Sequence, residues 1–141
     1  MSDPINGVDP VSTTVTPEPW SERLVLFLRV MAGLSLLKGL YHWAQVCGIG
    51  APAGVGFDAY PTAWQVATVF FAVIDLVAAV GLWLAAAWGA VLWLFAAFSM
   101  IAVELLFDQV YGGRTWVVLI EIVLVLTYFA LTFIASRERA E

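Results

Sequence analysis

Four long apolar stretches dominate the chain, and segments rich in glycine, proline or polar residues separate them. The stretches cover about residues 20–48, 62–84, 88–107 and 115–135. A helix needs about 20 mainly apolar residues to cross a hydrocarbon core of about 30 Å. Backbone polar groups in lipid must be satisfied within the segment itself, so the pattern predicts four transmembrane α-helices.

The boundaries of these stretches follow from local turn chemistry. Pro19 suits the start of a helix, and the segment Gly48–Gly56, with five glycine or proline residues after the first apolar stretch, ends it. The proline-free run 62–107 would measure about 69 Å as one helix, so it must fold back once. We place this turn at Ala85–Gly89, and a second turn at Tyr111–Arg114.

Composition supports a membrane protein rather than a soluble domain. The chain is 62% hydrophobic and 12% charged, with a mean hydropathy of +0.93. A soluble domain is about half apolar and a quarter charged. The formal charge of −5 and the lack of a basic face also argue against nucleic acid as a partner. We therefore expect an all-α fold, an integral membrane bundle of four helices with the lipid bilayer as its surroundings.

The ends of the chain differ from its middle. Residues 1–19 are polar and proline-rich, which is typical of a flexible tail, and residues 136–141 form a second short tail. No basic region precedes an apolar core as in a cleaved signal peptide, so the transmembrane domain, residues 20–135, would insert through its first span.

Basic residues predict the orientation. Four spans place both termini on one side, and that side holds Arg23, Arg137 and Arg139, with Arg29 able to reach towards it. The other side holds Arg114 alone. The positive-inside rule then predicts that both termini are cytoplasmic, in a multi-pass protein of the bacterial inner (plasma) membrane.

Apart from the charged residues near the start of the first span, the predicted spans carry a cluster of five ionisable residues: Lys38, His42, Asp75, Glu104 and Glu121. Charges at membrane depth are costly and usually face protein or water. Lys38 and His42 are four residues apart and share a helix face. Counting along each helix at 1.5 Å per residue places these two with Glu104 and Glu121 in the outer half, and Asp75 nearer the midplane.

This cluster has two interpretations. Lys38 could pair with Glu104 or Glu121 and simply lock the bundle, because buried charges need partners. Alternatively, three acids facing Lys38 and His42 would form a polar site open to the outer side. At least one carboxyl would then exchange a proton, or bind a cationic or protic ligand.

Other chemistry is absent from the sequence pattern. One histidine and one cysteine provide no zinc set, no disulfide and no pair of axial histidines for a membrane haem. No serine lies in a nucleophile-elbow motif. We therefore expect a protein that is not an enzyme, with no catalytic residue, no metal site and no cofactor.

Two family resemblances add to this interpretation. The pattern Arg29-x3-Gly33-x4-Lys38-Gly39 resembles the opening of DoxX-like proteins, small four-helix bacterial membrane proteins associated with quinone-linked redox enzymes. The segments Lys38–Gly50 and Phe70–Leu94, with the late Glu121, are more similar to an uncharacterised alphaproteobacterial four-helix inner-membrane family of unknown function. That family implies the fold but no activity.

The sequence thus leads to two functional expectations. The first is an accessory or assembly subunit of a larger membrane complex, with a membrane-protein partner or a second copy of the chain. The alternative is a small transporter, or a DoxX-like proton-coupled or quinone-linked redox subunit, in which the ionisable cluster acts and Asp75 serves as an inner relay. No quinone-binding motif supports quinone as a partner.

Overall fold

The computed structural model describes residues 19–138, and these residues form helices and loops without any strand. The predicted tail up to residue 18, the predicted anchor Arg139 and the last two residues lie outside the described residues. The elements are α1 (Pro19–Val46), the 3₁₀ turn η1 (Phe57–Ala59), α2 (Thr62–Trp83), α3 (Ala87–Leu106), α4 (Asp108–Tyr111) and α5 (Thr115–Glu138). Helices α1, α2, α3 and α5 are each long and apolar enough to cross a membrane.

The helix boundaries lie close to those expected from the sequence. The turn between α2 and α3 spans residues 84–86, so it begins one residue before and ends three residues before the predicted Ala85–Gly89, and Ala85 there has a positive φ of 51°. Gly81 and Gly89 pack directly against each other across this turn, and a methyl group on either would overlap the backbone of the other. The short helix α4 is an element that the sequence pattern did not predict.

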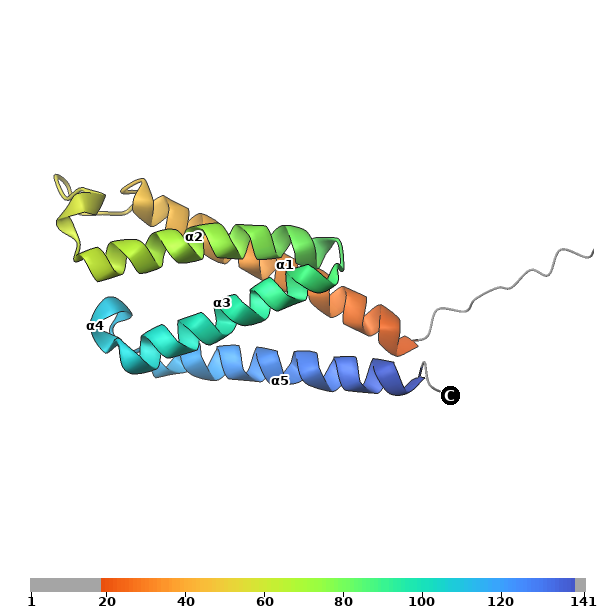
Figure 1. Cartoon of the computed structure of the whole chain (residues 1–141). Coiled ribbons are helices and arrows are strands. Elements are labelled where there is room, and N and C mark those ends of the chain that lie inside the picture. Colours follow the sequence, from red (N-terminus) through yellow and green to blue (C-terminus); the bar gives the residue numbers. More distant parts are fainter. Residues whose placement is uncertain (1–18, 139–141) are drawn as a thin grey trace, which may run out of the picture.

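The main contacts among the four long helices close a ring in which each helix has two main neighbours. Figure 1 shows these helices from the side, with α4 at the end away from the C-terminal end of α5. Helix α2 packs against α1 and α3, and α5 packs against α1 and α3, which closes the ring. The start of α1 and the end of α5 meet, since the backbone N–H of Trp20 donates to Glu138 Oε2 at 3.3 Å. We call this the terminal end of the bundle and the opposite end, which carries α4, the α4 end.

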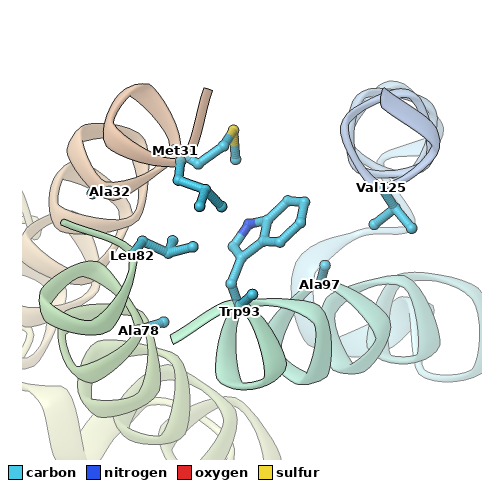
Figure 2. Close-up of a cluster of buried hydrophobic side chains, with 9 residues drawn as sticks. Met31, Ala32, Ala78, Leu82, Trp93, Ala97 and Val125 are labelled. Atoms are coloured by element: carbon cyan, nitrogen blue, oxygen red, sulfur yellow. The ribbon is translucent and has the colours of Figure 1, made fainter. Parts of the chain in front are cut away.

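An apolar core fills the half of the bundle nearer the terminal end (Figure 2). Trp93 on α3 is its largest member and is 2% exposed. Its ring contacts Phe27 of α1 and Tyr128 of α5 edge-on, with centroids 6.3 Å and 5.6 Å away. The remaining buried members are small or aliphatic and come from all four long helices: Leu28, Met31, Ala32, Ala78, Leu82, Ala90, Ala97 and Val125. This half of the bundle is therefore closed by close apolar packing.

Candidate functional site: two ionic groups in the polar half of the bundle

The buried polar side chains lie on the α4 side of the apolar core. They comprise Ser35, His42, Thr68, Asp75, Glu104 and Glu121, and all are 5% exposed or less. The structure divides the five ionisable residues predicted from the sequence into two separate ion-paired groups, with His42 in neither of them.

The first group, here called the Lys38 group, joins three helices through Lys38, Asp75 and Glu121. Lys38 Nζ on α1 donates a hydrogen bond of 2.7 Å to Glu121 Oε1 on α5, and it lies 3.9 Å from Asp75 Oδ1 on α2. The side chains of Asp75 and Glu121 are 0% and 7% exposed, whereas that of Lys38 is 33% exposed. Of the two partners proposed for Lys38, the structure therefore selects Glu121 over Glu104.

Close packing between α1 and α2 sets the register that brings Lys38 to Asp75. Gly39 follows Lys38, and a β-carbon at Gly39 would lie 2.8 Å from the Leu76 side chain. Without a side chain at this point, α1 and α2 approach closely, as small residues allow in membrane bundles. Asp75 precedes Leu76 and is thus level with Lys38, which corrects the expectation that Asp75 would lie nearer the midplane than the other members of the cluster.

The charges of the Lys38 group do not balance when both acids are ionised. One ammonium faces two carboxylates, and its close hydrogen bond goes to Glu121. Neither carboxyl oxygen of Asp75 has a hydrogen-bond partner among the described residues. A buried carboxylate without partners is costly, so the group has room for one more positive charge, either a proton or a small cation.

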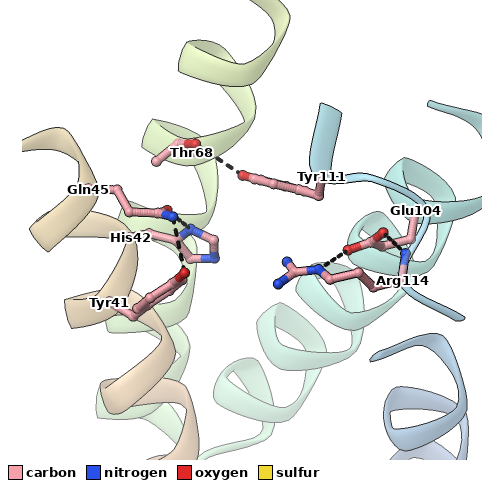
Figure 3. A network of polar contacts seen from close by, with 7 residues as sticks. All are labelled: Tyr41, His42, Gln45, Thr68, Glu104, Tyr111 and Arg114. Atoms are coloured by element: carbon pink, nitrogen blue, oxygen red, sulfur yellow. Dashed lines mark hydrogen bonds and ion pairs between the residues drawn. The ribbon is translucent and has the colours of Figure 1, made fainter. Parts of the chain in front are cut away.

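The second group, here called the Glu104 group, pairs Glu104 on α3 with Arg114 in the loop before α5 (Figure 3). The backbone N–H of Arg114 donates to Glu104 Oε2 at 2.7 Å, and Arg114 Nε lies 3.6 Å from Glu104 Oε1. The chain reverses between them at Gly112 and Gly113, whose φ values of 87° and 60° favour glycine. Glu104 Oε2 thus accepts a local hydrogen bond, whereas Glu104 Oε1 has no hydrogen-bond partner among the described residues and is neutralised only by the Arg114 guanidinium. Within the same residues, Glu104 forms no ion pair with Lys38.

His42 lies among aromatic rings rather than among acids. Its ring stacks on Phe71 with centroids 5.7 Å apart and lies 6.0 Å from the ring of Tyr111. His42 Nδ1 is 3.3 Å from Gln45 Oε1, which fits a proton on Nδ1, because an amide oxygen only accepts. Gln45 Nε2 in turn donates to the Tyr41 hydroxyl at 3.2 Å.

Tyr111 links α4 to α2. Its hydroxyl is 3.1 Å from the hydroxyl of Thr68, which is fully buried. Burial raises the pKa of the Tyr111 hydroxyl, so this group stays neutral and keeps its proton for the hydrogen bond. The ring centroid of Tyr111 lies 6.0 Å from that of His42 and 6.4 Å from that of Phe71, so three rings gather beside the polar groups at the α4 end. Figure 3 shows His42 and Tyr111 of this set.

The predicted topology anchors that the structure describes lie near aromatic rings at or towards the terminal end. The guanidinium carbons of Arg23, Arg29 and Arg137 are 4.3, 5.9 and 4.5 Å from the ring centroids of Trp20, Trp83 and Phe133. Such contacts are typical of basic and aromatic residues at a membrane interface. Which side of a membrane this end faces stays a prediction.

Sequence reasoning did not assign Arg114, Tyr111 and Thr68 to the site. From the sequence, Arg114 was interpreted only as a basic residue on the side away from the termini, and Tyr111 only as part of a turn. The Gly-Gly pair before Arg114 was the one available signal, because it allows the chain to reverse within ten residues of Glu104. The contact between Thr68 and Tyr111 has no sequence signal, since their helices meet only through the tertiary fold.

Among residues 19–138, no group of three or more His, Cys, Asp and Glu side chains is placed to hold a metal ion. Cys47 is exposed.

The chain belongs to a protein family described as "Family of unknown function (DUF6163)", which matches residues 22–139. The matched range contains α2, α3 and α5 completely and all but the first three residues of α1. No curated protein and no solved structure matches the chain. The resemblance to an uncharacterised family of unknown function is thus confirmed at that level.

Proposed function

We propose that this protein is a non-enzymatic membrane protein that holds one exchangeable proton at Asp75, as a proton-handling subunit of a membrane complex. The observation that carries the proposal is the fully buried carboxyl of Asp75, which has no hydrogen-bond partner within residues 19–138 and shares one ammonium with Glu121. In the low dielectric of a membrane interior, a proton on Asp75 balances the group at little cost.

Access to this proton would come from the α4 end. On that side, polar groups of His42, Tyr111 and Arg114 lie between Asp75 and the end of the bundle. On the other side, Trp93 and Leu82, at 2% and 0% exposed, close the path with apolar atoms. An arrangement with polar groups on one side and apolar atoms on the other supports proton binding and release from the polar side rather than passage through this subunit by itself.

Infrared spectroscopy of the reconstituted protein tests the proton site. At neutral pH we expect the C=O stretch of a protonated carboxylic acid, and we expect Asp75→Asn to remove it. Glu104→Gln is the matched control, because Glu104 is also buried but has Arg114 as its own cation. A band that persists in Asp75→Asn, or that Glu104→Gln removes instead, contradicts the proposal.

A second candidate function is an accessory or assembly subunit in which the Lys38 group only locks the helices. The observation that favours it is the light packing of α5, which buries only Val118, Glu121, Val125 and Ala135 among its described residues. The ion pair between Lys38 and Glu121 is then a main tie of α5 to α1. This role keeps the predicted membrane-protein partner and needs no exchangeable proton.

Purification from native membranes tests whether the protein is a subunit at all, and the infrared band of Asp75 separates the two candidates. An assembly role predicts that a partner co-purifies equally well with wild type and with Asp75→Asn. Recovery of the protein alone in gentle detergent, as a monomer or dimer, removes the basis for this role. The DoxX-like redox alternative predicts in addition a quinone or chromophore in the purified sample. A featureless visible spectrum and a lipid extract free of quinone count against it.

A further inference from the structure

A groove runs along the outside of the bundle between α1 and α2, near the terminal end. Its volume is about 390 Å³. Its walls are apolar side chains from two helices, namely Ala32, Gly33 and Leu36 of α1 and Leu76, Ala79 and Trp83 of α2. Because α1 and α2 are both able to span a membrane, this groove would face hydrocarbon.

The small residues make the groove concave. Ala32 and Ala79 are 3% and 6% exposed and form its floor, while Leu36 and Trp83 are 46% and 62% exposed and form its rims. A β-carbon at Gly33 would meet no heavy atom within 4 Å, so the chain leaves this space open. From Leu76 to Trp83 the groove extends about 10 Å along the helix, which matches the upper part of one lipid acyl chain.

A cation stands at the end of the groove nearest the bundle's terminal end. Arg29 lies one helical turn before Gly33 on the same face of α1, and its guanidinium carbon is 5.9 Å from the ring centroid of Trp83. Within the described part of the chain, Arg29 forms no ion pair, in contrast to Arg114. A guanidinium on a spanning helix that no carboxylate neutralises is matched in charge by an anion from the membrane.

We propose that this groove binds one anionic phospholipid, with its phosphate on Arg29 and one acyl chain between α1 and α2. Tryptophan rings prefer the headgroup level of a bilayer, so Trp83 marks the depth at which the phosphate would lie. A guanidinium holds a phosphate through two parallel charge-assisted hydrogen bonds. Charge and shape thus point to the same ligand, because the groove takes the chain and Arg29 takes the headgroup.

The test measures how much lipid the protein retains. Wild type and variants are extracted in mild detergent, exchanged against phosphatidylglycerol or phosphatidylcholine of the same chains, and weighed by native mass spectrometry. We expect one phosphatidylglycerol per wild-type chain and about a tenfold weaker retention in Arg29→Gln, since a charge-assisted contact is lost. Gly33→Leu fills the groove and should lower retention by a similar factor.

Two controls distinguish loss of lipid binding at this groove from a general effect of positive charge and from loss of the fold. Arg23→Gln removes another α1 arginine that lies over an aromatic ring but outside the groove, and we expect it to leave retention unchanged. Gly33→Leu replaces a poor helix former and meets open space, so circular dichroism should show an intact fold.

Three outcomes overturn the proposal. They are equal retention of the two lipids by wild type, equal retention of phosphatidylglycerol by wild type and Arg29→Gln, and an equal loss in Arg23→Gln. Glycerol phosphate added as a free headgroup should not displace the lipid, and displacement would show a phosphate site without a lipid groove.

Discussion

The two halves of the bundle hold the same four helices together by different means. Near the terminal end, one buried tryptophan and a set of small and aliphatic side chains fill the interior. Towards the α4 end, the same helices meet through the Lys38 group and the Glu104 group, with hydroxyls and aromatic rings between them. The apolar half is held by complementary shape, whereas the polar half is held by ion pairs and hydrogen bonds.

This difference indicates that the polar half of the bundle carries the ionisable groups on which a function would depend. In lipid, an apolar helix face gains little by packing on another helix instead of on lipid tails. Helices therefore associate mainly where complementary surfaces allow close contact. Buried ionic groups add no assured stability, because the cost of removing charges from water offsets much of their attraction. Within the described part of the chain these groups lie in one half, and Asp75 accepts no hydrogen bond there, which is the basis for the proposed proton site.

The largest loss of stability is expected from Trp93→Ala in the apolar half. Removing this side chain leaves a cavity at the point where α1, α2, α3 and α5 meet, and should lower the free energy of unfolding by about 4 kcal/mol. Denaturant unfolding in micelles, followed by circular dichroism, measures it. Trp93→Phe, which keeps an aromatic ring, should lower the free energy of unfolding markedly less than Trp93→Ala. A loss below about 1 kcal/mol would mean that this half is not the packed part of the bundle.

In the polar half, the expected effect depends on charge balance rather than on volume. Lys38→Met leaves Glu121 and Asp75 without their shared cation and should cost about 3 kcal/mol in the same assay. Adding Glu121→Gln to Lys38→Met should recover most of the lost stability, because the double variant removes both charges of the ion pair and leaves no unpaired Glu121 carboxylate. If the double variant is as unstable as Lys38→Met, the ion pair does not determine the packing of α5 on α1.

The smallest effect concerns the hydrogen bond between Tyr111 and Thr68. Tyr111→Phe and Thr68→Val should each cost about 1 kcal/mol, and the double variant should cost less than their sum. Additive losses in this cycle would show that the two hydroxyls are not coupled.

The raised pKa of Tyr111 also determines the direction in which stability changes with pH, because the folded state keeps a proton that the unfolded state releases. The stability that this tyrosine contributes is therefore present below its ordinary pKa of about 10 and falls as pH rises above it.

The sequence by itself was sufficient for the four long helices and their approximate ends. Apolar runs of membrane length and the glycine and proline residues between them carry this information locally, so α2, predicted at about 62–84, runs from Thr62 to Trp83. The sequence also identified each residue of the Lys38 group, because an ionisable side chain inside an apolar run is conspicuous. The helical turn α4 was missed, since four residues between two turns carry no periodic signal.

Only the tertiary structure decided which of these residues meet. Pairing depends on the order of helices around the ring and on their register, and neither is encoded in the spacing along one helix. The close approach at Gly39 brings Asp75 level with Lys38, and the reversal at Gly112 and Gly113 gives Glu104 its own arginine. The single cluster predicted from depth therefore became two groups, and the proposed proton site belongs to the one whose charges do not balance.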